Sequence, residues 1–191
     1  MLERSSDFTL NGNGLKCQLN CYVELMVRKQ TATRQLTPNW LNDDELDTWM
    51  VLIGVLLKLP AALDRQLRQD AGLTHFDYGV LAALSDAPNR TMRMSDLADF
   101  SQSSLSRLSH GVKRLEDRGW VHRSPLPTDG RITMAKLTAA GMRMLVATAP
   151  GHVEEVRRLV MHGLTAEQRA VLRDVGTTVL ERIDPGPTST S

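Results

Sequence analysis

The chain has 191 residues, which is enough for one domain with a hydrophobic core and too few for two domains of ordinary size. Hydrophobic residues make up 41% of it and aromatic residues only 4%, which favours a helical core rich in Leu, Ala and Val over a β-sandwich. The net charge of +1 excludes a uniformly basic or acidic protein, but residues 101–131 alone carry a net charge of +3, with six basic and three acidic side chains.

The sequence shows no targeting signal and no continuous apolar run long enough to span a membrane. Its first residues are charged, and no apolar stretch of the secretory type follows them. The longest apolar run, residues 50–63, has about 14 residues and is interrupted by Lys58 and Pro60, whereas a membrane-spanning helix needs about 20. We therefore expect no membrane association and a cytoplasmic location.

Residues 1–40 show no clean hydrophobic period, so we expect an N-terminal extension that is disordered or partly helical, with Met26 as an alternative start. Its two cysteines, Cys17 and Cys21, do not form a disulfide framework by number or spacing and are interpreted as incidental thiols. The tail, residues 184–191, consists of Asp, Pro, Gly, Ser and Thr and is expected to be disordered.

The first predicted helix starts at Asn42 or Asp43, where acidic residues suit the positive end of the helix dipole, and it stops at Gly72. Pro60 lies inside it and is expected to kink it or to remove one backbone hydrogen bond. A second helix follows from Thr74. Its expected buried positions are Phe76, Val80, Leu81 and Leu84.

A short extended piece at residues 91–95 precedes a short helix, 95–100, for which Ser95 is the expected N-cap. The next helix ends at Gly119 and is amphipathic. Its expected apolar face consists of Leu105, Leu108, Val112 and Leu115. Its opposite face is small, polar and basic, with Ser103, Ser106, Arg107, His110, Lys113 and Arg114 lining or flanking it.

Two strand-like runs, residues 120–124 and 131–137, surround the turn-forming residues 125–130. They predict a β-hairpin with a loop longer than two residues.

Two further helices follow the hairpin. Thr138 caps the first, which contains Pro150 as a second expected kink and ends by Gly163. Thr165 and Gln168 form a capping box for the last helix, which runs to Ile183.

In this order the elements predict a mainly α protein: a winged helix-turn-helix with a small β-hairpin wing and added helices at both ends. A helix with an exposed polar, basic face can enter the DNA major groove. Arg131 on the hairpin would then reach the adjacent minor groove, which is narrow and electronegative. Asp129 would accept hydrogen bonds from an arginine or from backbone amides and fix the loop.

Residues 95–141 resemble the MarR family of bacterial transcriptional regulators. The resemblance is clearest in "RLEDRGWVHR" (114–123), in "DGR" (129–131) and in "LTAAG" (137–141), and it extends more weakly over about 43–183. It implies a ligand-responsive repressor that binds a pseudo-palindromic DNA operator as a homodimer, without a cofactor. It also implies that the first and the last two helices form the dimer interface, and that a small phenolic or anionic effector releases the DNA.

The resemblance assigns domains and residues. It implies a MarR-like domain at 41–183, with a winged-helix head at about 74–137 and dimerisation helices at about 43–72 and 138–183. The implied DNA-binding residues are Ser103, Ser104, Ser106, Arg107, His110, Lys113, Arg114, Arg123, Asp129 and Arg131, with Arg123 near phosphate. The implied ligand-pocket residues are Trp49, Ile53, Tyr78 and Met142. Gly111 departs from the larger residue that the family has in mid-helix.

The sequence is compatible with other functions to different degrees. No Ser/His/Asp arrangement, phosphate-binding loop or carboxylate pair supports an enzyme. His152 with Glu154 or Glu155 would supply half of a metal site, which leaves a metal-sensing regulator as one alternative. A winged-helix protein-interaction module is the other, although such a module would more often expose apolar residues where this chain has serines, Arg107 and His110.

Overall fold

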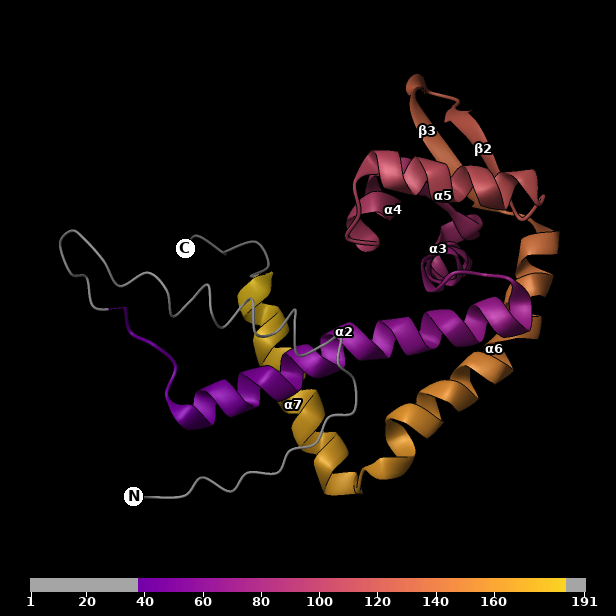
Figure 1. The fold of residues 1–191 in the computed structure, drawn as a ribbon. Helices are drawn as coiled ribbons and strands as arrows, with labels where there is room; N and C mark the ends of the chain where they lie inside the picture. The colour runs from indigo at the N-terminus through magenta and orange to yellow at the C-terminus, as the bar shows by residue number, and fades with distance from the viewer. Residues whose placement is uncertain (1–37, 185–191) are drawn as a thin grey trace, which may run out of the picture. The chain divides into compact units, whose positions relative to one another are not determined.

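The computed structural model describes residues 38–184, nearly all of which belong to one unit that starts at Asp44 (Figure 1). The elements are α2 (Asp43–Ala71), α3 (His75–Asp86), η1 (Pro88–Arg90), β1 (Thr91–Arg93), α4 (Met94–Phe100), α5 (Leu105–Asp117), β2 (Val121–Leu126), β3 (Asp129–Leu137), α6 (Ala139–Leu159), η2 (Met161–Gly163) and α7 (Ala166–Ile183). The predicted winged helix-turn-helix with added helices at both ends is confirmed.

The predictions for Cys17, Cys21 and Met26, and for disorder or partial helix in residues 1–37 of the extension, fall outside the described residues. The same holds for the tail beyond residue 184.

The core of the described chain lies in the head, where α3, α4, α5 and the sheet meet the end of α2 and the start of α6. Its fully buried large side chains are Leu67, Leu73, Val80, Leu81, Leu84, Leu97, Leu108, Val112, Leu115 and Val121. Two predicted core positions differ. Leu105 is 55% exposed because it opens α5 before the helix reaches the core, and Phe76 is only half-buried at the edge of the core.

Two of the predicted N-caps, Thr138 and Thr165, are confirmed, whereas Ser95 is not an N-cap. Thr74 and Thr165 form complete capping boxes with Asp77 and Gln168, and Thr138 accepts a hydrogen bond from the Gly141 amide. The prediction for α4 is wrong. Its N-cap is Arg93, without a side-chain cap, because the helix begins one residue before Ser95.

Helix α2 runs without interruption across Pro60, and α6 does the same across Pro150 before it gives way to η2. By length and composition α2 is apolar enough to cross a membrane: its most apolar 18-residue window has a mean hydropathy of 1.7 and is only 6% buried. The sequence prediction missed this because it counted a continuous run of apolar residues. Most of the apolar surface of α2 is therefore exposed in the described part of the chain.

The sheet has the order β1-β3-β2 and is antiparallel throughout. The hairpin loop has two residues, Pro127 and Thr128, so the prediction of a longer loop is wrong. The strand includes Pro125 because β2 is an edge strand and can lack one amide donor. The register then shifts: Pro125 pairs with Thr133 but Leu126 pairs with Asp129, which leaves Arg131 in an irregular segment of β3.

Two glycines permit close packing inside the head. A Cβ on Gly111 would lie 2.7 Å from the Cε1 atom of Phe76, so glycine lets α5 approach the ring on α3. This contact explains why the chain has no larger residue in the middle of α5. A Cβ on Gly141 would overlap the backbone carbonyl oxygen of Trp120, so glycine lets the start of α6 pass beside the segment between α5 and β2.

Replacement of Gly141 by alanine is expected to lower the free energy of unfolding by about 2 kcal/mol, since backbone atoms must move to admit the Cβ. Urea denaturation measures the change. The matched control is Gly79→Ala on α3, which has open space around its Cβ position and should gain about 0.5–1 kcal/mol in helix propensity. Equal stability of the two variants would show that the Gly141 contact is not a constraint.

Candidate nucleic-acid interface

Helix α5 divides into an inner apolar face and an outer polar face. Leu108, Val112 and Leu115 are buried, whereas the side chains that alternate with them are exposed. The predicted outer residues Ser106, Arg107, His110, Lys113 and Arg114 are all exposed. The helix therefore presents a polar, basic surface on the side away from the core.

The serines before α5 are occupied by local hydrogen bonds. Ser104 is the N-cap and accepts from the Arg107 amide at 3.2 Å. Ser103 is half-buried, and its hydroxyl lies 2.9 Å from that of Ser101. Both residues thus form the turn that leads into α5, and Ser106 is the predicted serine that lies on the exposed helix surface.

Two basic side chains of α5 make only exposed contacts. The Lys113 ammonium donates to Asp117 at 3.1 Å, and both side chains are more than half exposed. The Arg107 guanidinium lies 5.2 Å from the centre of the Phe76 ring. The exposed ion pair of Lys113 with Asp117 contributes roughly 0–1 kcal/mol and is screened by salt, and the Arg107 side chain is itself exposed. Both cations are therefore available to an anionic partner.

Arg114 differs because its partner is buried. Its guanidinium donates to Asp77 at 2.9 Å, and the Asp77 side chain is only 8% exposed. The same carboxylate accepts from the Thr74 amide in the capping box of α3. Arg114 therefore joins α5 to α3.

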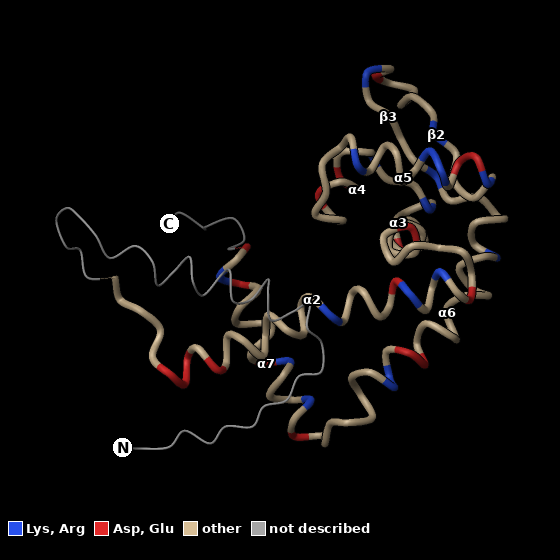
Figure 2. Tube along the Cα trace, in the orientation of Figure 1, with Lys and Arg blue, Asp and Glu red and all other residues tan. Residues whose placement is uncertain are grey.

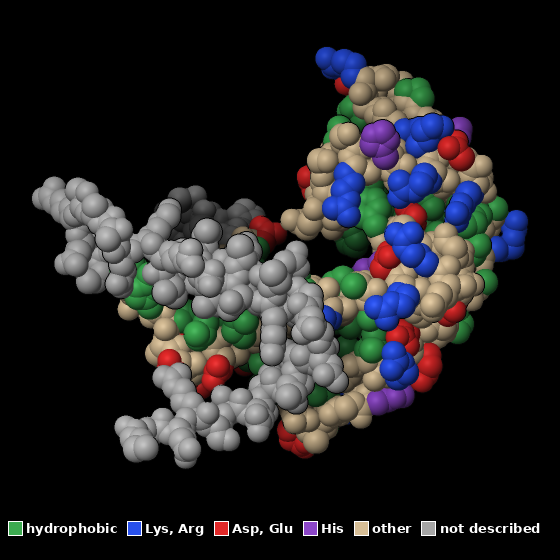
Figure 3. All heavy atoms as spheres, viewed as in Figure 1, with side chains coloured by type: hydrophobic (Ala, Val, Ile, Leu, Met, Phe, Trp, Pro, Cys, Tyr) green, Lys and Arg blue, Asp and Glu red, His purple; other side chains and the backbone are tan. Residues whose placement is uncertain are grey.

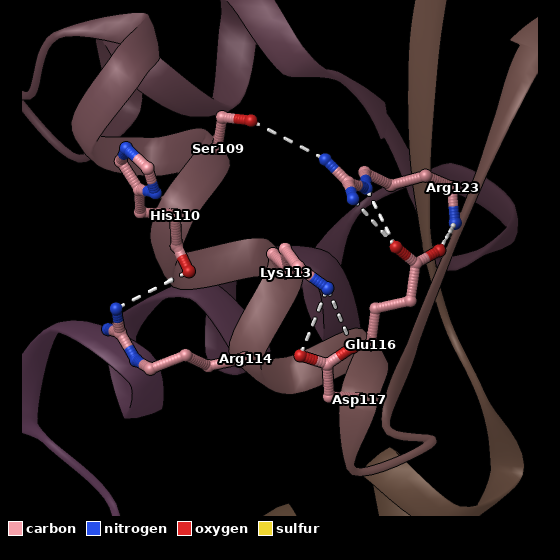
Figure 4. Close-up of polar contacts among 7 residues, drawn as sticks. All are labelled: Ser109, His110, Lys113, Arg114, Glu116, Asp117 and Arg123. Atoms are coloured by element: carbon pink, nitrogen blue, oxygen red, sulfur yellow. Dashed lines mark hydrogen bonds and ion pairs between the residues drawn. The ribbon is translucent and has the colours of Figure 1, made fainter.

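Arg123 on β2 faces α5 and bonds to it at several atoms (Figure 4). Its Nε donates to Glu116 at 2.9 Å, and its backbone amide donates to the other oxygen of the same carboxylate at 2.9 Å. A terminal nitrogen donates to the Ser109 hydroxyl at 3.4 Å. These contacts lower the pKa of Glu116. The hydrogen bond from the Arg123 backbone amide is the largest cause, and the guanidinium adds to it.

Arg131 on the wing is more exposed than Arg114 and Arg123. The side chain of Arg131 is 91% exposed and donates to both carboxylate oxygens of Asp129 at 2.9–3.0 Å, while its amide donates to one of them at 3.1 Å. These bonds lower the pKa of Asp129, with the guanidinium as the largest cause. The structure thus brings the two residues together in the predicted arrangement.

Basic side chains gather near α5 and the hairpin. Figure 2 shows basic and acidic residues together at the tip of β2 and β3, and Figure 3 shows Lys and Arg with a histidine among them over the head. The basic segment predicted from the sequence therefore becomes a surface that combines one helix face and the wing.

The four predicted ligand-pocket residues lie on different surfaces. Trp49 is 46% exposed and Ile53 is half-buried, both on α2, while Met142 packs against the core from α6. None of them lines the open depression of about 560 Å³ between α3, β1 and α4, which Arg93, Phe100 and Met134 border.

Tyr78 belongs to a polar cluster that sequence reasoning missed. Its ring lies 4.5 Å from that of His152, whose centroid lies 5.9 Å from His75. His152 is buried, and its Nδ1 lies 3.2 Å from Gln66 Oε1. Burial, and secondarily the charge of His75, lowers the pKa of His152, and burial raises the pKa of Tyr78. No short-range sequence signal links these residues, because they lie on α2, α3 and α6.

The half metal site considered for His152 is not assembled. The ring of His152 packs against Tyr78 and Gln66, while Glu155 bonds to Arg158 at 2.6 and 2.7 Å. Among residues 38–184 the structure groups no three His, Cys, Asp or Glu side chains in a way that could hold a metal ion.

Comparison with known proteins decides the family. The model of the MarR family matches residues 71–132. The structure of Sco3205 from Streptomyces coelicolor, a MarR family transcriptional regulator in complex with DNA, is 42% identical, and the match covers 79% of this chain and 97% of that one with a TM-score of 0.73. The chain belongs to the MarR family. It is therefore a transcriptional regulator and not an enzyme, as predicted.

Two further relatives agree with this MarR assignment. AbsC, a MarR family regulator from Streptomyces coelicolor, is 35% identical over 78% of this chain and 99% of its own, with a TM-score of 0.72. The HTH-type transcriptional regulator PecS from Dickeya dadantii is 27% identical over 72% of this chain and 86% of its own.

The buried His152 gives this MarR protein a predicted pH dependence. Below about pH 6.5 an unfolded histidine takes up a proton, whereas the folded protein resists doing so because the pKa of His152 is lowered. Its contribution to stability is therefore present above about pH 6.5 and is lost as the pH falls. We expect the melting temperature to drop between about pH 7.5 and about pH 5.5, and His152→Asn to reduce that drop. The exposed His122→Asn is the control, and an equal drop in both variants would contradict the assignment.

Proposed function

We propose that this MarR-family regulator binds a pseudo-palindromic DNA operator as a homodimer and represses transcription until a small effector binds. The observation that carries the proposal is the exposed basic face of α5 beside the exposed Arg131 of the wing. The 42% identical relative Sco3205 was solved in complex with DNA, which supports DNA as the partner of this protein.

The proposed base contacts come from the outer face of α5 in the major groove. Ser106 and His110 offer hydrogen-bonding groups to base edges, and Arg107 suits guanine or phosphate. Lys113 lies further along the same face and is placed at phosphate. Arg131 is placed in the adjacent minor groove, where its carboxylate partner keeps the guanidinium in one orientation.

A homodimer is proposed because two helices expose apolar side chains that a monomer would leave in water. On α2 these are Leu46, Trp49, Val51, Leu52, Val55, Leu56 and Leu57, and on α7 they are Val171, Leu172, Val175, Val179, Leu180 and Ile183. Surfaces of this kind mark sites of association. A second copy, rather than a lipid bilayer, is the proposed partner, since α2 also carries the fully buried Leu67 into the head core. The cytoplasm, where the DNA lies, is the proposed location.

The effector is proposed to be a small phenolic or anionic molecule held near Trp49, Ile53, Tyr78 and Met142. In a two-state mechanism it would favour a spacing of the two heads that no longer matches successive major grooves. Half-sites one helical turn, about 10 bp, apart would satisfy the symmetry of the dimer.

The proposed operator binding is tested with a duplex that the wild-type protein itself selects from a random-sequence library. Fluorescence anisotropy with unrelated competitor DNA and a salt series gives the affinity. Binding that resists the competitor and weakens steeply with salt is expected. If the protein selects no duplex, DNA binding by this surface is refuted.

Replacement of Arg131 by alanine should weaken binding to that duplex by about tenfold, because one minor-groove contact is lost. The matched control is Arg158→Ala, since Arg158 also forms an exposed two-bond pair with a carboxylate but lies on α6. Both variants should keep the wild-type molecular mass in solution. Unchanged affinity of the Arg131 variant would remove the wing from the interface.

Replacement of Leu56 by glutamate should convert the dimer to a monomer, since it places a charge in the proposed apolar interface on α2. Analytical ultracentrifugation in the absence of DNA measures the mass. Phe100→Glu is the control, because Phe100 is an equally exposed apolar residue on α4 in the head. A wild-type chain that is monomeric, or that partitions into vesicles, would overturn the proposed homodimer.

A further inference from the structure

The Glu116 carboxylate connects the recognition helix α5 to the wing. It lies in the last turn of α5, two helical turns after Ser109 on the same face, and both side chains bond to Arg123 on β2 (Figure 4). One oxygen accepts from the Arg123 amide and the other from Nε, while Nη2 lies 2.8 Å from that second oxygen. The contact therefore orients both the backbone of β2 and the guanidinium.

Arg123 is placed differently from the cations that face solvent. Its side chain is 27% exposed, against 63% for Lys113 and 91% for Arg131. The Nε and Nη1 atoms of its guanidinium already donate hydrogen bonds to Glu116 and Ser109 of α5. A phosphate contact at Arg123 would have to compete with a carboxylate held by two bonds at fixed geometry.

We infer that Glu116 and Arg123 form a positioning pair that sets the wing against the recognition helix, and that Arg123 does not contact DNA. β2 pairs with β3 along Arg123 and Ala135, and β3 carries Arg131, so the orientation of the pair determines where Arg131 lies relative to α5. This inference rests on the proposed function, because it concerns the geometry with which the same two elements meet DNA.

The positioning pair and the phosphate contact suggested by the resemblance predict opposite results. If Arg123 contacted phosphate, Glu116→Gln would remove a competing negative charge and tighten binding. If the pair positions the wing, the same change weakens binding. Arg123→Lys also distinguishes a phosphate contact from a positioning pair. Lysine keeps the point charge that a phosphate needs but loses the planar arrangement of donors that fits the Glu116 carboxylate.

The experiment compares Glu116→Gln, Arg123→Gln, Arg123→Lys and the double Gln variant on one duplex selected by the wild-type full-length protein, at several salt concentrations. We expect each to weaken binding by about tenfold, the double variant no more than either single one, with the same salt slope in all four variants. Asp117→Asn is the matched control, because it removes the neighbouring exposed carboxylate that faces Lys113 and should not weaken binding. Thermal melts establish that each variant is folded at the assay temperature.

A second cycle tests action through the wing. Arg131→Ala should cost less affinity in the Glu116→Gln background than in the wild type, although Glu116 and Arg131 share no hydrogen bond or ion pair among those found. A role in stability alone would lower the melting temperature and leave this coupling absent.

Three outcomes overturn the inference. Tighter binding by Glu116→Gln, or a salt slope reduced by about one in Arg123→Gln with near wild-type binding by Arg123→Lys, would place Arg123 at phosphate. Lower melting temperatures with unchanged affinity would make the pair structural only. A wild-type protein that selects no duplex would overturn the proposed function itself, and this inference with it.

Discussion

The close packing of α5 against α3 is the constraint on which the rest of the head depends. Leu108, Val112 and Leu115 are buried completely or nearly so, and Gly111 sits where any larger residue would meet the ring of Phe76. Because a helix with one face fixed in a core has its opposite face fixed as well, this packing determines which side chains of α5 are exposed. The polar surface that contacts DNA in our proposal is thus a consequence of an apolar contact on the far side of the same helix.

Much of this arrangement follows from local patterns that a sequence contains. The structure confirms two helix bounds that rest on such patterns. Helix α2 ends just before Gly72, and α7 begins after the Thr165 capping box. Some failures originate in neighbours that are distant along the chain, whereas others are local, such as the start of α4 one residue before Ser95. Pro125 disfavours a strand in the sequence, but β2 is an edge strand, where the missing amide is tolerated.

In the candidate site, the sequence alone does not predict which charged residues are free to bind a partner. Composition marks the segment 101–131 as basic, but it does not distinguish arginines that face solvent from those that join elements. Arg114 pairs with a buried aspartate 37 residues away, and Arg123 with a carboxylate on the preceding helix. The difference lies in the burial of the partner, which depends on the tertiary fold. The cluster around His152 was missed for the same reason, since Gln66 is 86 residues from it in the chain.

The wing illustrates why a carboxylate can belong to an anion-binding surface. The pair of Asp129 and Arg131 has no net charge, so it cannot attract DNA by charge alone. What Asp129 supplies is orientation: two hydrogen bonds hold the guanidinium of an exposed side chain that would otherwise lose rotamer entropy on binding. The entropic cost is then met during folding of the hairpin, in which the Arg131 amide also bonds to Asp129. On this argument the affinity of the wing depends on the rigidity of its attachment to α5 as much as on the arginine, and that attachment is made where Glu116 meets Arg123.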